Sequence, residues 1–296
     1  MNDCVERFER LRAPLARHAY RMLGQYGDAE DVVQDAYLRW SEALSKTSIE
    51  DDNAFLRTTV TRLCLDRLRS AHARREVYVG PWLPEPVVSG DADTPEVSAL
   101  LADDISFALL LALERLAPLE RAAFLLHDVL DVPFGEIAHT LGRSEPAVRK
   151  LASRAREHVR DARRPSPGNR EETLRLRDAF LTALTNDDAV ALERLLTDDV
   201  VFTSDGGGKV PTAIVPVAGR DRVARLLVGL RRKGATFTHR IELVTLNGLP
   251  GFAIFSERAL ELTLALEIVN GRVAAMYAMR NPDKLRAVAA ALAPQS

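Results

Sequence analysis

The apolar positions in about the first 75 residues recur at spacings of three and four. The first stripe consists of Phe8, Leu11, Leu15 and Ala19. Stripes at residues 32–40 and 56–68 keep the same spacing, which places apolar side chains on one face of a helix. The pattern predicts helices that bury one face each against their neighbours, and we assign residues 1–76 to a first all-α domain.

Residues 77–98 lose this periodicity and contain four prolines and two glycines. Such a composition is typical of a connector. Helical spacing returns near Leu100 and continues to about Arg163, which predicts a second all-α domain over residues 99–164. A short proline-containing linker is expected at residues 165–170.

From residue 171 the pattern becomes mixed. Helical spacing is found at residues 171–185, 188–197 and 219–232. Strand-like runs are found at residues 200–202, 210–219, 237–246, 251–269 and 272–280. Because a few helices precede mostly sequential strands, we expect an α+β domain with an antiparallel sheet over residues 171–296.

Positive charge is concentrated in two blocks, although the formal net charge is only -2. Residues 57–75 hold six Arg against one acidic residue, and residues 143–164 hold eight Arg or Lys against three. The intervening residues 76–136 hold twelve acidic residues against two arginines. Two separated basic helices indicate a nucleic-acid footprint, since Lys and Arg displace counterions from phosphates. Solvated helix faces are the alternative, and charge alone does not separate the two.

Residues 132–160 have the layout of a helix-turn-helix. A short apolar face at Ile137, Ala138 and Leu141 is followed by a glycine turn. Ser144 is placed to cap a second helix. If the apolar side chains of that helix point inward, its angle of about 100° per residue directs outward Arg149, Lys150, Ser153 and Arg154. Such side chains suit the major groove of DNA; an ordinary helical hairpin with a charged outer face is the alternative.

Several classes of protein and site are not indicated. The chain opens without an apolar signal segment and has no run of about 18 uncharged apolar residues, which a membrane span would need. Cys4 and Cys64 follow no metal-ligand spacing, and we expect both thiols to be structural. We therefore expect a cytoplasmic, reduced protein without a metal or cofactor.

Three segments together resemble a known family. They are YGDAEDVVQDAYLRW (residues 26–40), FLRTTVTRLCLDRLRSAHARRE (residues 55–76) and the helix-turn-helix at residues 132–160. In this order and at this spacing they resemble regions 2 and 4 of extracytoplasmic-function (ECF) RNA polymerase sigma factors. The resemblance implies a transcription initiation factor, not an enzyme, whose partners are RNA polymerase core and promoter DNA.

The resemblance also assigns roles to individual residues. The site for the clamp helices of the polymerase largest subunit would consist of Asp31, Gln34, Asp35 and Leu38. The minus-10 element would meet Asn53, Arg57, Arg62 and Arg69. The minus-35 element would meet Ser144, Arg149, Lys150, Ser153 and Arg154, and the polymerase flap is a further expected contact. A polar loop at residues 48–53 beside a basic helix suits capture of an unstacked base, while the acidic residues near Asp31 also suit a helix N-terminus.

Three short motifs narrow the resemblance to ECF sigma factors of the SigJ type, which carry a SnoaL-like C-terminal domain. WLPEP comprises Trp82, Leu83, Pro84, Glu85 and Pro86. DGGGK comprises Asp205, Gly206, Gly207, Gly208 and Lys209. NPDKL comprises Asn281, Pro282, Asp283, Lys284 and Leu285. The resemblance implies an α+β cone, with a curved antiparallel sheet wrapped by helices around an internal pocket, that modulates sigma activity in place of a separate anti-sigma factor.

Physical chemistry suggests how the three motifs act. The glycines of DGGGK permit positive φ and close approach of a neighbouring segment, although a flexible hairpin connection is the alternative. The prolines of WLPEP restrict the unbound chain and lower the cost of docking Trp82 and Leu83. NPDKL either begins a terminal helix or docks it. We expect these interdomain regulatory motifs to set how the two DNA-reading regions are arranged.

Two other functions of the C-terminal domain stay open. An apolar pocket with a few polar groups would make it a ligand sensor. SnoaL relatives also include polyketide cyclases, and the candidate acid/base residues on strand-like segments are His239, Glu242, Glu257, Arg258, Glu261, Glu267 and Tyr277. No His/Asp pair at a revealing spacing accompanies them.

Overall fold

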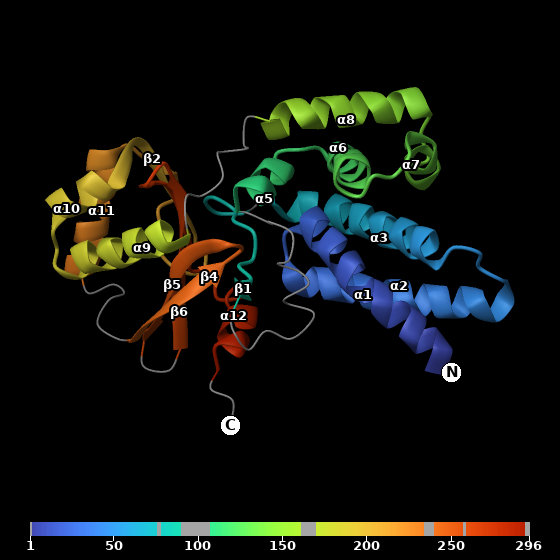
Figure 1. The fold of residues 1–296 in the computed structure, drawn as a ribbon, viewed down its shortest axis with the longest axis horizontal. Helices are drawn as coiled ribbons and strands as arrows, with labels where there is room; N and C mark the ends of the chain where they lie inside the picture. Colours follow the sequence, from blue (N-terminus) through green and yellow to red (C-terminus); the bar gives the residue numbers. More distant parts are fainter. Residues whose placement is uncertain are drawn as a thin grey trace. The chain divides into compact units, whose positions relative to one another are not determined.

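The computed structural model describes residues 2–75, 78–89, 107–160, 170–233, 240–256 and 259–293 (Figure 1). The chain forms two compact units. Unit 1 consists of Met1–Val77 and Thr94–Arg163, and unit 2 consists of Tyr78–Asp93 and Arg164–Ser296. The first part of the connector expected from the sequence therefore belongs to the same unit as the C-terminal domain.

Unit 1 begins with α1 (Asn2–Leu23), α2 (Tyr26–Lys46) and α3 (Asp52–Arg75). The apolar stripes of these helices are mostly buried, as their spacing predicts, and Leu11 and Tyr37 are partly buried. Trp40 of α2 is 0% exposed, and its indole Nε1 donates to the carboxylate of Asp52 at 3.0 Å. The hydrogen bond satisfies the polar end of a large buried ring, and it fixes the start of α3 against α2.

The rest of unit 1 consists of α5 (Phe107–Glu114), α6 (Pro118–Phe124), the π-helical turn η1 (Leu125–Val129), α7 (Phe134–Leu141) and α8 (Glu145–Arg160). Ile137 of α7 shares a small core with Val148 and Ala152 of α8. Gly142 ends α7 in the left-handed region, at φ 61 and ψ 42, which a residue without Cβ adopts without steric cost. The predicted helix-turn-helix is confirmed.

A buried arginine connects these two groups of helices. Arg121 of α6 is 2% exposed. Its Nη1 donates to the carbonyl of Met22, at the end of α1, at 2.6 Å and to the carboxylate of Glu114 at 2.7 Å. A buried guanidinium needs such partners because its desolvation is costly. Within unit 1, α6 is therefore fixed to the end of α1.

Unit 2 is built on one sheet. Its strands are β1 (Val88–Ser89), β2 (Leu196–Asp205), β3 (Val217–Ala218), β4 (Arg240–Leu246), β5 (Leu249–Ser256), β6 (Ala259–Val269) and β7 (Arg272–Met279). Across the described residues, the strand order is β1-β4-β5-β6-β7-β2-β3. The first strand in this order, β1, begins two residues after the WLPEP motif, and its Val88 pairs with Leu246 of β4.

The α+β fold class is confirmed, but the sheet is mixed, so the predicted antiparallel sheet has one parallel pair. The consecutive strands β4 to β7 pair antiparallel, but β2 pairs parallel with β7, with Thr203 opposite Tyr277. Parallel neighbours need a long crossover connection. Here β3, α11 (Arg220–Arg232) and β4 to β6 form that connection. Hydrophobic patterning marks strands but not their direction, and the sequence analysis missed this pairing for that reason.

The two faces of the sheet carry different layers. One face packs a hydrophobic core against α9 (Arg170–Thr185), α10 (Ala189–Leu195) and α11, as Figure 1 shows. Leu262, Leu264 and Leu266 of β6 belong to this core because alternate residues of a strand point to the same face. Residues of the opposite parity, such as Glu267, point to the other face. The short helix α12 (Arg286–Ala291) follows β7.

Within the described ranges, none of the helices combines the length and the apolar character that a bilayer span requires.

Candidate polymerase, DNA and linker sites

The four residues expected to bind polymerase core lie together on α2. Asp31, Gln34, Asp35 and Leu38 are all exposed, and their spacing places them on one side of the helix. Leu38, at one end of the strip, is 58% exposed. The strip therefore presents two carboxylates and an amide beside one apolar side chain.

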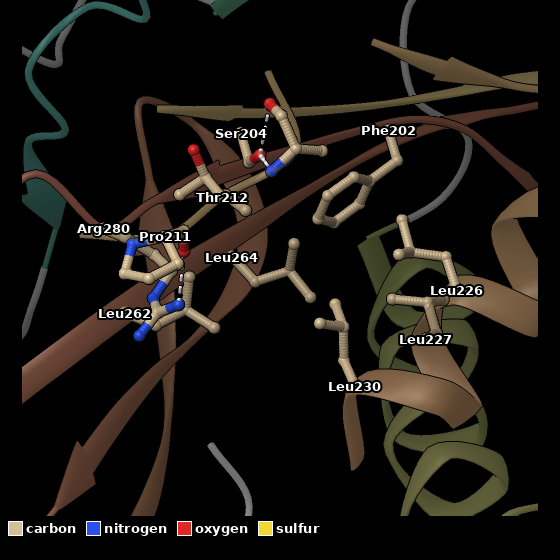
Figure 2. Close-up of a pocket in the computed structure, with 12 residues that line it drawn as sticks. Phe202, Ser204, Pro211, Thr212, Leu226, Leu227, Leu230, Leu262, Leu264 and Arg280 are labelled. Atoms are coloured by element: carbon tan, nitrogen blue, oxygen red, sulfur yellow. Dashed lines mark hydrogen bonds between the residues drawn. The ribbon is translucent and has the colours of Figure 1, made fainter. Parts of the chain in front are cut away.

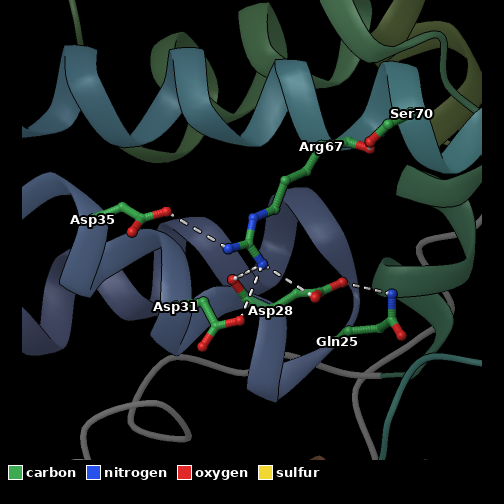
Figure 3. A network of polar contacts seen from close by, with 6 residues as sticks. All are labelled: Gln25, Asp28, Asp31, Asp35, Arg67 and Ser70. Atoms are coloured by element: carbon green, nitrogen blue, oxygen red, sulfur yellow. Dashed lines mark hydrogen bonds and ion pairs between the residues drawn. The ribbon is translucent and has the colours of Figure 1, made fainter.

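An arginine that the sequence analysis did not single out organises this strip. Arg67 of α3 points at the aspartates of α2, as Figure 3 shows. Its Nη1 lies 3.1 Å from Asp28 and 3.4 Å from Asp31, and its Nη2 lies 3.7 Å from Asp35. We call Asp28, Asp31, Asp35 and Arg67 the Arg67 network. The spacing of the three aspartates along one helix face was the available signal, but their common partner lies on another helix.

Two of the arginines expected at the minus-10 element are bound by α7. Arg57 of α3 donates to the carboxylate of Glu136 at 3.0 Å. Arg62 donates to the backbone carbonyl of Thr140 at 3.0 Å, whose hydroxyl is 3.1 Å from that of Thr58. The helix-turn-helix thus contacts the basic helix α3 inside unit 1. Asn53 is exposed, and so is Arg69, which pairs with Asp66 at 3.3 Å.

The residues expected at the minus-35 element line the outer side of α8. Val148, Ala152, Ala155 and Val159 are buried, and exposed residues are Ser144, Arg149, Lys150, Ser153 and Arg154. The prediction of the two faces of this helix is confirmed. Arg149 pairs with Glu145 at 2.5 Å, and its guanidinium carbon lies 4.5 Å from the centroid of the Phe134 ring. Such stacking orients a guanidinium without a buried partner.

In unit 2 the carboxylate of Asp205, at the end of β2, binds the WLPEP segment. Its Oδ1 accepts from the hydroxyl of Tyr78 at 2.5 Å and from the N–H of Gly207 at 2.9 Å. Its Oδ2 accepts from the N–H of Leu83 at 2.9 Å and from the ammonium of Lys284 at 2.8 Å. Asp205 is 0% exposed, so its charge depends on these partners. We call Tyr78, Leu83, Asp205, Gly207, Asn281 and Lys284 the linker site.

Lys284 gives the linker site its second charge. Besides Asp205, its ammonium donates to the carbonyl of Leu83 at 2.6 Å, and it lies 4.0 Å from the centroid of the Trp82 ring. The indole face attracts a cation, and more so away from water. Asn281 donates to the Tyr78 hydroxyl at 3.0 Å. All three sequence motifs therefore meet at one buried ion pair.

Close backbone approach explains the glycines of DGGGK. Gly207 has φ 62, and a Cβ atom there would lie 2.4 Å from the side-chain nitrogen of Asn281. A Cβ atom on Gly206 would lie 2.4 Å from the carbonyl oxygen of Val210. Gly208 has φ 70, and a Cβ atom there would lie 3.2 Å from the Cβ of Val79. The expected close approach is confirmed, and the alternative of a free hairpin connection does not hold.

The remaining residues of the motifs surround this centre. In the WLPEP segment the buried residues are Leu83, Pro84, Glu85 and Pro86, and Trp82 is half-buried. Lys209 pairs with the exposed Asp283, and this hydrogen bond lowers the pKa of the Asp283 carboxyl. Pro282 is exposed, whereas Leu285 is buried at the start of α12.

A cavity of about 370 Å³ lies between α11 and the sheet (Figure 2). None of the candidate acid/base residues that the structure describes, Glu242, Glu261, Glu267 and Tyr277, lines it. The hydroxyl of Tyr277 donates to Glu267 at 2.5 Å on the opposite face of the sheet. His239, Glu257 and Arg258 lie outside the described residues. Among described residues, no group of three His, Cys, Asp or Glu is placed to hold a metal ion.

Comparison with known proteins places the chain in a family. The family model of Sigma-70 region 2 matches residues 7–74, and that of Sigma-70 region 4 matches residues 106–159. The chain is 43% identical over 295 residues to the ECF RNA polymerase sigma factor SigJ of Mycobacterium tuberculosis, covering 95% of this chain and 92% of the relative. It is 32% identical to the probable ECF sigma factor SigI of the same species over 281 residues, covering 93% of this chain and 92% of that relative.

The structural comparison extends over both units. The crystal structure of M. tuberculosis SigJ matches with a TM-score of 0.79 at 40% identity, covering 96% of this chain and 98% of the other. Sequence and fold therefore agree along nearly the whole length. The chain belongs to the extracytoplasmic-function family of RNA polymerase sigma factors, in the group of SigJ.

Proposed function

We propose that the exposed strip on α2 is the site for polymerase core. As a family member, this protein is a transcription initiation factor that directs RNA polymerase core to promoters. Leu38 offers an apolar contact at one end of the strip, and Asp31 and Asp35 offer charge complementarity to a basic partner. This supports the clamp helices of the largest subunit as the partner. A groove of about 410 Å³ between α1 and α2 includes Asp31 and Gln34 and extends the same surface.

The outer side of α8 is proposed to read the minus-35 element. Arg149, Lys150 and Arg154 are exposed there together with Ser153. Arg and Lys bind guanine edges or phosphate, and the second helix of a helix-turn-helix is the one that enters the major groove. Asn53, Arg57, Arg62 and Arg69 are proposed for the minus-10 element. The polymerase flap stays an expected partner of α5 to α8.

A closed, inactive arrangement of unit 1 is the second part of the proposal. The observation that carries it is the contact of α7 with Arg57 and Arg62. A guanidinium that is bound to Glu136 is not available to a phosphate of the minus-10 region. Promoter binding therefore requires α7 to leave α3.

Unit 2 is proposed to control this opening through the linker, in place of a separate anti-sigma factor. Residues 76–106 connect α3 to α5, and the linker site holds residues 78–89 of this connection. A connection that is held in this way restricts how far α5 to α8 move from α3. Loss of the linker site releases residues 78–89 from unit 2 and favours opening.

The first experiment removes the closing contact without touching a proposed DNA contact. Glu136→Ala should raise promoter-specific transcription with core polymerase by several-fold, because Arg57 is then released. Glu157→Ala is the matched control, since Glu157 is an exposed acidic residue of α8. Equal transcript from both variants would refute the closed state.

The second experiment tests the linker site. Lys284→Met removes the buried cation, and Arg286→Met is the control because Arg286 is an exposed base two residues away. We expect more transcript from Lys284→Met and from a chain ending just before Asn281, and wild-type levels from Arg286→Met. A chain ending after about Arg164 tests removal of the whole C-terminal domain. Absence of a promoter-specific transcript from every form would overturn the proposed sites.

A further inference from the structure

Leucine is the commonest residue type lining the cavity of unit 2. Leu226, Leu227 and Leu230 of α11 lie across from Phe202 and Leu264 of the sheet, as Figure 2 shows. Binding of an apolar ligand in such a cavity is favourable, because water inside it finds few hydrogen-bond partners. The linker site on the opposite face of the sheet does not use this space.

Two polar groups converge on one end of the cavity. The guanidinium of Arg280 donates from Nη1 to the carbonyl of Pro211 at 2.8 Å, while its buried Nε has no acceptor. The hydroxyl of Ser204 contacts the backbone of Ala213, with the N–H of Ala213 at 3.1 Å. In the part of the chain that the structure describes, no carboxylate pairs with Arg280. The cavity thus combines leucine walls with a cation that lacks an anionic partner.

We infer that this cavity binds a small apolar carboxylate. A guanidinium recognises a carboxylate with two parallel hydrogen bonds, and the leucines would cover an aliphatic chain. A cavity of about 150 Å³ holds benzene, so one of about 370 Å³ holds a ligand of roughly 15 non-hydrogen atoms. A medium-chain carboxylate such as decanoate meets this size and charge.

The backbone joins the cavity to the linker site at two places. Ser204 lines the cavity, and the next residue of β2 is Asp205 of the linker site. Likewise Arg280 lines the cavity, and Asn281 follows it. The carbonyl of Asp205 accepts from the N–H of Arg280 at 2.8 Å and from that of Asn281 at 3.0 Å. A ligand that draws Arg280 toward its carboxylate therefore pulls on the backbone that holds Asp205 and Asn281.

Binding of the carboxylate is thus coupled to the state of the linker. The effect of this coupling on transcription rests on the proposed role of the linker site. Binding of the carboxylate itself does not depend on that role. By linkage, a ligand that changes the linker site must bind with different affinity when that site is broken. The cavity would make unit 2 a sensor of apolar acids.

The first test measures binding to the whole chain by calorimetry. Decanoate should bind about 10- to 100-fold more tightly than decanol, the range expected for a hydrogen bond to a charged group. Arg280→Met should abolish this preference while leaving the affinity for decanol unchanged, which shows that the cavity is intact. Arg272→Met, an exposed arginine at the other end of β7, is the matched control. Ala278→Phe should fill the cavity and abolish binding of both compounds.

The second test follows the linker without transcription. The chain has two tryptophans, Trp40 and Trp82, so Trp40→Phe leaves the fluorescence of Trp82 beside Lys284 as the only indole signal. Decanoate should change this emission, and Asp205→Asn should change the affinity for decanoate by about tenfold, a coupling of ordinary size. Absence of decanoate binding overturns the site, and equal affinity for decanoate and decanol overturns the role of Arg280. Binding with unchanged Trp82 emission overturns the coupling, while the proposed function stands or falls by the transcription assays.

Discussion

The Arg67 network and the linker site each pair a cationic side chain with aspartate, but the first cluster is exposed and the second is buried. In the Arg67 network the Arg67 side chain is 29% exposed, and its aspartates are between 43% and 67% exposed. In the linker site the side chains of Lys284 and Asp205 are 6% and 0% exposed. Water and salt screen the first cluster, so each of its contacts is weak and exchangeable. The second cluster is stable only in one geometry, because each buried charge needs its partner.

This difference matches the tasks proposed for the two clusters. A surface that must bind another protein needs charges that release their internal partners at little cost. A site that holds a linker needs charges for which release is costly. If burial determines whether the charges separate easily or at high cost, substitutions in the two clusters must differ strongly in their effect on the free energy of unfolding.

The largest effect is expected for Asp205→Ala. It leaves the buried ammonium of Lys284 without a counterion, which costs about 3–5 kcal/mol of the free energy of unfolding. Urea denaturation followed by Trp82 fluorescence, in the Trp40→Phe background, measures the loss. The double variant Asp205→Leu with Lys284→Met should recover much of it, because an apolar pair replaces a buried ion pair. A loss below about 1 kcal/mol, the range of an exposed pair, would remove the contrast between the clusters.

A smaller effect is expected for Gly207→Ala. A left-handed backbone costs an L-residue about 1–2 kcal/mol, and the new Cβ would also lie 2.4 Å from Asn281. Gly271→Ala separates these causes, since Gly271 has φ 71 and nothing lies within 4 Å of its Cβ position. We expect Gly207→Ala to destabilise unit 2 by about twice as much as Gly271→Ala, allowing about 1–3 kcal/mol for the clash. Equal losses of stability in thermal unfolding would show that the Asn281 side chain moves away from the new Cβ atom at little cost.

His18 tests whether burial of an ionisable side chain also affects the free energy of unfolding in unit 1. It is 2% exposed, and its Nε2 lies 2.9 Å from the hydroxyl of Thr61. Burial, together with Arg21 and Arg57, lowers the pKa of His18 to about 3. The unfolded chain binds the proton more readily, so the free energy of unfolding falls as pH decreases from about 6.5, the ordinary value, toward about 3. The expected slope is about 1.4 kcal/mol per pH unit.

The check is denaturant unfolding of the wild type and of His18→Gln at several pH values between about 7 and 5. The variant keeps a polar group near Thr61 but does not titrate, so its dependence on pH should be flatter. Parallel curves for the two proteins would show that His18 does not contribute.

The smallest effect is expected for Arg67→Ala. Exposed ion pairs contribute about 0–1 kcal/mol, and high salt should reduce the difference from the wild type further. Arg121→Ala is the contrasting variant in the same unit, because Arg121 is 2% exposed and pairs with Glu114 at 2.7 Å. Urea unfolding at low and high salt compares them. A loss for Arg67→Ala as large as that for Arg121→Ala would show that exposure does not weaken the network.

Periodicity predicted the local structure well because helical faces are local. The buried side of α8, including Val148 and Ala152, follows from the angle between successive residues. The turn before α8 follows from Gly142, which alone among its neighbours has positive φ. Both inferences need only a short window of sequence.

Long-range contacts were beyond such reasoning. The strands β2 and β7 pair in parallel, although α11 and the four strands β3 to β6 lie between them along the chain. Arg67 could be placed on a basic helix, but its three aspartates lie on the preceding helix. The linker site was expected only because three motifs resembled those of one protein group. The pairing of Asp205 with Lys284 at its centre depends on tertiary structure, which local sequence patterns do not specify.

The order of synthesis gives the linker site a consequence in time. Lys284 follows Leu83 by 201 residues, and ribosomes add about 5–20 residues per second. Leu83 is therefore made roughly 10–40 s before Lys284 is made. Each nascent chain passes through a stage in which α3 and α8 are complete while the WLPEP segment has neither Asp205 nor Lys284 to bind. A newly synthesised chain therefore lacks a complete linker site until residues 281–285 emerge.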